Sequence, residues 1–172
     1  MAKVLMIIAQ QGFRDEELLI PKEILEREGH SVKVASITRM KASGSKGAVV
    51  QPDMAVYEAN ADFFDAVVVV GGPGSPALSE TREVIDFVIA MGAKKKLTSA
   101  ICLGPMTLAK AGILAGKNAT VWPSRSAIAL LRNTECNYRN EPVVVDGLVV
   151  TADGPQSAGM FGAELASMLK RR

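Results

Sequence analysis

The stretch AVVVVGGPG, residues 66–74, decides the fold of this chain. Five consecutive apolar residues, mostly β-branched, are typical of a short strand buried on both faces, as in a parallel sheet. The glycines and the proline that follow end this strand in a turn. We therefore expect a parallel sheet that is covered by helices on both faces.

Further apolar strands alternate with helical segments along the rest of the chain. The expected strands are Val4–Ala9, Ser31–Ile37, Leu97–Ile101, one that begins at Thr120-Val121, and a hairpin over Val143–Thr151. The expected helices run from after Gly12 to Gly29, and over about Arg82–Met91, Met106–Leu114, Ser126–Arg132 and Ser157–Leu169. This alternation predicts an α/β fold with an open, mostly parallel sheet. Residues 38–60 are turn-rich, and their secondary structure is left open. We interpret residues 43–47 as a loop, with a small hairpin as a further interpretation of this segment.

Length and composition suit a single domain over residues 1–172. The chain is 48% hydrophobic and 22% charged, which excludes a disordered class, and its net charge of +2 gives no case for nucleic-acid binding. The basic end Lys170-Arg171-Arg172 is too short to change this and suits a solvated helix end. The first apolar run is too short for a secretory or membrane segment, so we expect a cytoplasmic protein.

The chain has two cysteines, Cys102 and Cys136, and one histidine, His30. This set suits neither a disulfide framework nor a metal site, and any catalytic triad would need His30. His30 follows a helix end and precedes a strand, which is the wrong edge of the sheet for catalysis, so we expect a solvated turn residue. Cys136 lies in a polar run and is expected to be exposed or at an edge.

Cys102 is the candidate nucleophile. It follows a buried strand and opens a helix, so the amides at the helix start are expected to favour the thiolate and lower the thiol pKa. The alternative is a small buried hydrophobe in a packed strand.

Glu17 is the candidate partner of Cys102. It shares a helix face with Ile20, Pro21 and Ile24, and that face must meet the core. If the two meet, burial raises the carboxyl pKa, and a protonated Glu17 is expected to donate a hydrogen bond to the thiolate. The alternative is a surface glutamate, while Asp15 suits a capping or solvated position.

The glycines at 71–74 lack the spacing of a dinucleotide motif and the lysine of a P-loop. The amide of Gly72, paired with that of Leu103, can instead form an oxyanion pocket beside Cys102, or the glycines can simply build a turn. Trp122 is expected to line the same cleft, with plain packing as the alternative.

These pieces together resemble the ThiJ/PfpI family, also called the DJ-1/PfpI superfamily. The resemblance covers nearly the whole chain and is strongest over 100-AICLGP-105, with 108-LA-109 and 111-AGILAG-116. Supporting stretches are residues 13–21, 70-VGG-72, 145-VDG-147 and 149-VVT-151, and Gly154-Pro155 is similar to a family turn near the site.

The resemblance implies a flavodoxin-like fold and assigns a role to each matched position. Cys102 matches the family nucleophile, Glu17 the carboxyl that hydrogen-bonds it, and Gly72 and Leu103 the amides of the oxyanion pocket. Gly154 and Pro155 then line the cleft. It also implies a homodimer or higher homo-oligomer, and it places Arg27 where some members have an arginine that lines a cleft or interface.

The chain departs from the family where histidine is expected. Members read as proteases carry His after the cysteine, where this chain has Leu103, and others bring a histidine to the position of Trp122. Peptide hydrolysis needs a positioned base, so an intracellular cysteine protease is disfavoured.

Two chemical hypotheses and one structural hypothesis remain open. The first is a glyoxalase or deglycase, without metal or organic cofactor, in which Cys102 adds to a small carbonyl substrate. The second is a redox-sensing or chaperone-like stress protein whose Cys102 meets an oxidant and forms a sulfinate. The third is a purely structural oligomer. Whether the chain is an enzyme stays undecided at this point.

Overall fold

A seven-stranded sheet forms the centre of the computed structural model, which describes residues 1–171. Arg172, the last residue of the basic end, lies outside the described residues. The strand order is β11-β12-β8-β7-β1-β3-β6, and every neighbouring pair is parallel except β11 with β12. The strands are β1 (Lys3–Ile7), β3 (Ser31–Ser36), β6 (Met54–Ala55), β7 (Ala66–Val69), β8 (Leu97–Ile101), β11 (Val143–Asp146) and β12 (Val149–Ala152). The mostly parallel α/β fold predicted from the sequence is confirmed.

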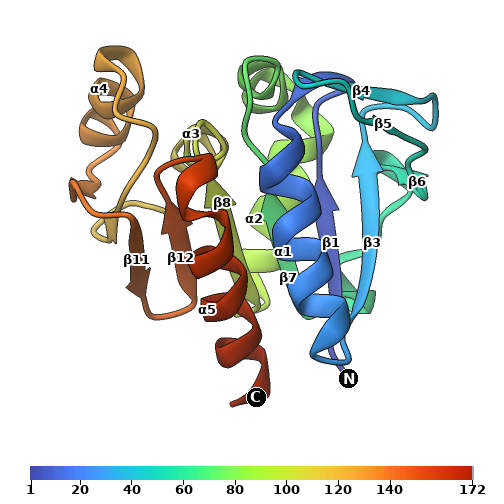
Figure 1. Ribbon diagram of the computed structural model, residues 1–172. Coiled ribbons are helices and arrows are strands. Elements are labelled where there is room, and N and C mark those ends of the chain that lie inside the picture. The colour runs from blue at the N-terminus through green and yellow to red at the C-terminus, as the bar shows by residue number, and fades with distance from the viewer. Residues whose placement is uncertain (172) are drawn as a thin grey trace.

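Helices cover both faces of this sheet. In Figure 1, α1 and α5 lie side by side in front of the strands, while α2 and α3 lie behind them. The helices are α1 (Asp15–Arg27), α2 (Arg82–Ala93), α3 (Pro105–Lys110), α4 (Arg125–Asn133) and α5 (Ala158–Lys170). Within the described residues, four 3-10 helices add to them, namely η1 (Val56–Glu58), η2 (Ala61–Phe63), η3 (Ser75–Glu80) and η4 (Pro155–Ser157).

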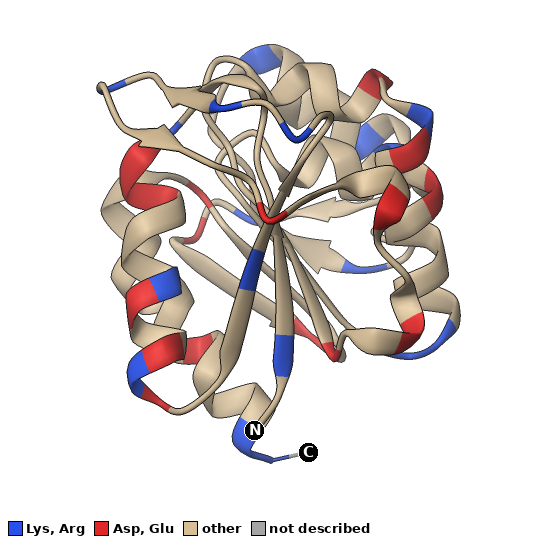
Figure 2. Ribbon diagram, turned by 90° about the vertical axis from the view of Figure 1, so that its right-hand side faces the viewer, with Lys and Arg blue, Asp and Glu red and all other residues tan. Residues whose placement is uncertain are grey.

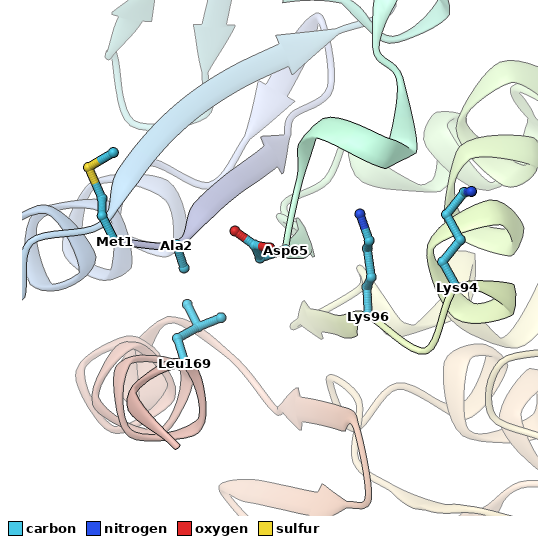
Figure 3. Close-up of a pocket in the computed structure, with 6 residues that line it drawn as sticks. All are labelled: Met1, Ala2, Asp65, Lys94, Lys96 and Leu169. Atoms are coloured by element: carbon cyan, nitrogen blue, oxygen red, sulfur yellow. The ribbon is translucent and has the colours of Figure 1, made fainter. Parts of the chain in front are cut away.

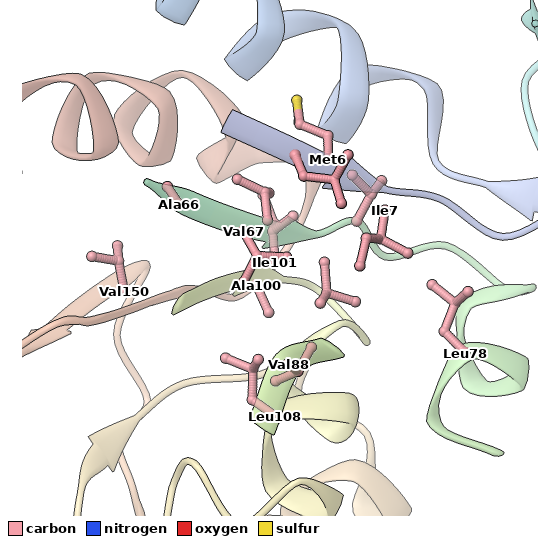
Figure 4. Packing of buried hydrophobic residues seen from close by; sticks show 14 of the residues in the cluster. Met6, Ile7, Ala66, Val67, Leu78, Val88, Ala100, Ile101, Leu108 and Val150 are labelled. Atoms are coloured by element: carbon pink, nitrogen blue, oxygen red, sulfur yellow. The ribbon is translucent and has the colours of Figure 1, made fainter. Parts of the chain in front are cut away.

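The core lies between the sheet and these helices. All four residues of β7 and all five of β8 are buried, as a strand covered on both faces requires. Figure 4 shows side chains of β1, β7, β8 and β12 in this core, with Val88 of α2 and Leu108 of α3 below the sheet. The continuous apolar runs in the sequence therefore reflect burial from two sides.

The strand order reverses beside β1. The chain passes from β1 to β3 on one side and later returns to β7 on the other side. In open α/β sheets, the crevice at such a switch point, outside the carboxyl ends of the strands, is where sites form. The segments after β1, β7 and β8 all leave the sheet at this edge, which is the upper edge in Figure 1.

Residues 38–60, left open by the sequence, contain a small hairpin. Strands β4 (Ala42–Gly44) and β5 (Val49–Val50) pair antiparallel, and β4 also pairs with β2 (Gln11–Phe13). Asp15 is not a helix cap, because Arg14 occupies the N-cap position. The Asp15 carboxylate instead accepts hydrogen bonds from the backbone N–H groups of Lys46 and Ala48, so it holds the hairpin loop against α1.

Two predicted elements differ in extent. The strand expected at Thr120-Val121 is instead the two-residue β9 (Asn118–Ala119), which pairs with β10 (Asn137–Tyr138) outside the main sheet. The helix expected to reach Leu114 ends at Lys110, and Gly112 adopts a positive φ of 77° soon after. The hairpin over Val143–Thr151 is confirmed as β11 and β12.

Figure 2 shows residues of both charge signs distributed over the helices and loops. Within residues 1–171, no helix has the length and apolar character needed to cross a membrane.

Candidate active site

Cys102 sits on a sharp, strained elbow between β8 and α3. Its φ is +63°, a left-handed conformation that side-chain-bearing residues rarely adopt. Two hydrogen bonds fix this backbone: the Cys102 N–H donates to the Ala152 carbonyl at 2.8 Å, and its carbonyl accepts from the Trp122 N–H at 2.8 Å. The sheet thus presents the Cys102 side chain at its edge at the expense of local strain.

Glu17 enters the same place from the first turns of α1. Its side chain is fully buried, at 0% exposed, so the expectation of a core-facing carboxyl is confirmed over a surface one. Oε2 accepts a hydrogen bond from the Gly71 N–H at 2.9 Å. Oε1 is also buried and bonds to no nitrogen or oxygen group in the described part of the chain. The backbone therefore anchors only one oxygen of the carboxyl.

Gly71 and Gly72 let these parts come together. A Cβ on Gly71 would lie 2.5 Å from Glu17 Oε2 and 2.6 Å from the Cβ of Cys102, closer than real atoms approach. Gly72 has a φ of +112°, and a Cβ on it would clash with the backbone of Arg14. Three chain segments therefore approach one another closely at the turn after β7, and only glycine leaves enough room at these two positions.

The carboxyl and the thiol interact as one titrating pair. Burial raises the pKa of Glu17 to about 7, despite opposing hydrogen bonds from Cys102 and the Gly71 amide. Burial, the charge of Glu17 and the hydrogen bond to it raise the pKa of Cys102 to about 12. The pair thus holds two protons below pH about 7 and one proton over the range above it.

The predicted lowering of the Cys102 pKa is wrong in direction. The N–H groups of Gly72 and Leu103 do bond to the sulfur and lower its pKa, as expected of amides at this turn. Burial and the neighbouring carboxylate outweigh them, because a second negative charge in a poorly solvated place is unfavourable. At neutral pH the favoured form is therefore a thiol beside a carboxyl close to its own titration point.

A cavity of about 220 Å³ opens in front of the sulfur. We call it the Cys102 cavity; it is lined by Arg14, Glu17, Gly72, Pro73, Cys102, Leu103, Trp122 and Pro155. Six of the seven candidate site residues thus surround one space. The seventh, Gly154, lies behind Trp122, where a Cβ would come within 2.9 Å of the indole ring, so it supports the wall instead of lining it.

The sequence interpretation did not name two of the lining residues, Arg14 and Pro73, and only Arg14 carries a charge. Its side chain pairs with Glu16, with 2.6 Å between Nε and Oε2, and its backbone N–H donates to the Gly71 carbonyl at 2.9 Å. This long-range contact brings Arg14 to the cavity. Its place three residues before Glu17, at the helix start, was the one local signal.

Three other residues lie away from the Cys102 cavity. Arg27 borders a separate hollow with Ile24, Glu28 and residues of α5, so it does not line this cleft. His30 is half-buried, not solvated, and its Nδ1 accepts a hydrogen bond from the Ala2 N–H. Cys136 is buried, not exposed, and its Sγ donates to the Lys117 carbonyl.

A larger hollow of about 450 Å³ lies at the opposite edge of the sheet, where the parallel strands begin. Figure 3 shows its lining residues, Met1, Ala2, Asp65, Lys94, Lys96 and Leu169. None of them is a nucleophile of the kind found at Cys102. Among residues 1–171, no cluster of three or more His, Cys, Asp or Glu side chains could hold a metal ion. The smaller cavity is therefore the better candidate site.

Comparisons with known proteins agree with this fold. The model of the DJ-1/PfpI family matches residues 2–168. A protein of Methanocaldococcus jannaschii, itself uncharacterised, is 42% identical over 99% of this chain and 83% of its own length. A deglycase of Pyrococcus abyssi is 33% identical over 98% of this chain and 99% of its own. The solved structure of a ThiJ/PfpI domain protein from Brachyspira murdochii, 31% identical, has a TM-score of 0.95 and covers 99% and 97% of the two chains.

Proposed function

The chain belongs to the DJ-1/PfpI family, and on that premise we propose that it is a cofactor-free enzyme acting on small reactive carbonyl compounds, of the glyoxalase or deglycase type. One observation carries the proposal: a nucleophilic sulfur and a carboxyl with a pKa of about 7 meet at the base of one small cavity. The similarity to a deglycase supports the same class of substrate.

The first step uses Glu17 as the base. The thiolate is the nucleophile of cysteine chemistry, and a carboxyl that titrates near 7 is well matched to taking and returning a proton at neutral pH. Glu17 accepts the Cys102 proton as the sulfur attacks the aldehyde carbon of a compound such as methylglyoxal. A carbon–sulfur bond forms, the carbonyl π pair moves to oxygen, and Glu17 returns the proton to that oxygen. The product of this step is a hemithioacetal.

The developing oxyanion needs donors close to the sulfur. The backbone N–H groups of Gly72 and Leu103 both face Cys102. Fixed amide donors aimed at developing charge lower the barrier because they need no reorganisation during the reaction. We assign them this role, while Trp122 and Pro155 form the walls that limit substrate size.

Sulfur oxidation is the second candidate function, because the same two amides can hold the oxygens of a Cys102 sulfinate. After mild peroxide, intact mass should then show two added oxygens on Cys102. The raised pKa of the thiol opposes this function, since oxidation depends on the thiolate. Oxidation that prefers Cys136 would argue against a sensor role for the cavity cysteine.

Peptide hydrolysis is the least supported chemistry for this site. The sequence has one histidine, His30, and its ring bonds to the amide of Ala2 near the start of β1, at the opposite edge of the sheet. Without imidazole help the leaving amine lacks the usual proton donor. Glu17 would have to both deprotonate the thiol and protonate the leaving amine.

Consumption of methylglyoxal, followed with lactate formation, tests the proposed function. Cys102→Ala should abolish it, and Glu17→Gln should lower the turnover by about 10²- to 10⁴-fold, the usual contribution of general acid–base catalysis. Cys136→Ala is the matched control, because that thiol lies outside the Cys102 cavity. It should keep wild-type turnover.

Two results would contradict the proposal. One is an absence of consumption by wild-type protein at high enzyme concentration. The other is consumption that survives Cys102→Ala.

A further inference from the structure

Arg14 gives the Cys102 cavity a positive charge beside its reacting pair. Of the eight residues that line the cavity, all within the described chain, Arg14 alone is cationic. The charges of Glu17 and Cys102 both act on its guanidinium, which places the three groups within electrostatic reach of one another. The cavity is therefore asymmetric, with an anionic pair at its base and a cation on its wall.

The guanidinium retains capacity for another acceptor. Its hydrogen bonds to Glu16 use Nε and Nη2, at 2.6 and 3.5 Å, and no partner of Nη1 is found within residues 1–171. Arginine carries five N–H donors, so Glu16 leaves several of them for a ligand. The pair with Glu16 is partly solvent-exposed, and such surface pairs contribute little, so a ligand carboxylate can share or displace it.

The net charge of the cavity decides which substrates it accepts. Above pH about 7 the Glu17–Cys102 pair holds one negative charge. Without a cation that charge would repel any anion that approaches the sulfur, whereas Arg14 offsets it. An arginine also matches the planar, two-oxygen shape of a carboxylate.

We propose that Arg14 is a specificity-determining residue that binds the carboxylate of a small carbonyl compound while its carbonyl carbon meets Cys102. The substrate class is then anionic carbonyl compounds, of which glyoxylate is the smallest probe. This inference rests on the proposed function and names the substrate class for the same sulfur. The bond changes are those of the addition step above: sulfur bonds to carbon, and the carbonyl oxygen takes the proton from Glu17.

Paired thiol reagents test the anion preference without requiring turnover. Iodoacetate and iodoacetamide both alkylate cysteine with loss of iodide, but only iodoacetate carries a carboxylate. The ratio of their rates at Cys102, read by peptide mass, cancels any change in the amount of thiolate. Arg14→Gln should lower this ratio by about threefold to tenfold, as expected for loss of a partly exposed charge contact. Arg14→Lys should restore part of it.

Arg27→Gln is the matched control, since Arg27 lies on the same helix but borders another hollow. It should leave the ratio unchanged. Glyoxylate and glyoxal, which are of similar size, form the carbonyl arm: each competes with iodoacetamide by adding to Cys102. The measured quantity is the concentration of each compound that halves the alkylation rate of Cys102. The ratio of the glyoxylate concentration to the glyoxal concentration should be lower in the wild type than in Arg14→Gln.

The outcomes separate this inference from the proposed function. Equal reagent ratios in wild type and Arg14→Gln would overturn the inference, even where carbonyl consumption through Cys102 is observed. A lowered ratio together with a lost glyoxylate preference would support it. A lowered ratio in a protein that consumes no carbonyl compound would support the anion site and overturn the proposed reaction.

Discussion

The two cysteines differ in what surrounds the sulfur, not in how exposed each residue is. Cys102 is 7% exposed and Cys136 5%, yet Cys102 lines a cavity beside a carboxyl, whereas Cys136 donates to the carbonyl of Lys117. We predict that iodoacetamide modifies Cys102 well before Cys136 in the native protein, as measured by peptide mass over time. Equal rates, or a faster Cys136, would show that cavity access and the base do not govern reactivity.

The sequence predicted some of these residues and not others, for physical reasons. The burial of Glu17 was predicted from a helix face shared with Ile20, Pro21 and Ile24, and Glu17 and Pro21 are indeed buried. Ile20 is exposed and Ile24 only half-buried, so the buried face instead continues through Leu18 and Leu25. Arg14 was not predicted, because the turn after β7 brings its backbone to the cavity through a contact with Gly71 that is distant in sequence. Cys136 was mispredicted because its polar neighbours gave no sign that Lys117 would supply a carbonyl.

The turn after β7 is the element that holds the site together. A methyl group at Gly71 would clash with Glu17, with Cys102 and with the carbonyl of Ile101. We predict that Gly71→Ala lowers the free energy of unfolding by about 1–3 kcal/mol, as overpacking typically does, and also slows Cys102 alkylation. Chemical denaturation and alkylation rates measure the two effects.

Gly159→Ala is the matched control for that substitution. Gly159 lies in α5, and a Cβ there meets nothing within 4 Å. Replacing a helical glycine with alanine should raise the free energy of unfolding by about 0.5–1 kcal/mol without touching alkylation. A Gly71→Ala protein with wild-type stability and wild-type alkylation would contradict the close approach described for this turn.

Among the elements, long apolar runs were predictable and short pairings were not. The strands β1, β7 and β8 follow continuous apolar stretches, because both of their faces are covered. The two-residue β9 carries no such pattern, since its place depends on pairing with β10, about twenty residues further along the chain. The local sequence therefore predicted the central strands of the sheet but not the short strands outside it.

For the whole molecule, the buried carboxyl makes stability depend on pH. The pKa of Glu17 is about 7 in the folded state against an ordinary value of 4.5, so between these values the folded protein binds more protons than the unfolded chain. The contribution of Glu17 to stability must then fall as pH rises through this range, by about 3 kcal/mol. Glu17→Gln removes this contribution.

Denaturation curves of wild type and Glu17→Gln at several pH values between 4.5 and 8 check this sign. The variant should gain stability relative to the wild type as pH rises. Curves that run parallel over the whole range would mean that the carboxyl titrates at its ordinary pKa in the folded protein.

The arrangement of the whole sheet explains why the candidate site residues lie together at one edge. The switch point beside β1 leaves room where the segments after β1, β7 and β8 emerge, and these segments supply Glu17, Gly72 and Cys102. The alternation of strands and helices predicted this edge, while the resemblance to the family assigned roles to its residues. The charge state of the pair depended on burial, which no local pattern in the sequence reveals.

The pH dependence of Cys102 alkylation by iodoacetamide, in wild type and Glu17→Gln, tests most directly whether Glu17 acts as the base for Cys102. The wild-type rate should rise through pH about 7, because the ionised carboxyl then accepts the thiol proton. In Glu17→Gln the rise should move to higher pH, and the rate at neutral pH should fall by about 10²-fold. A variant that reacts as fast as the wild type at neutral pH, or faster, would show that the carboxylate only repels the thiolate, and the account would fail.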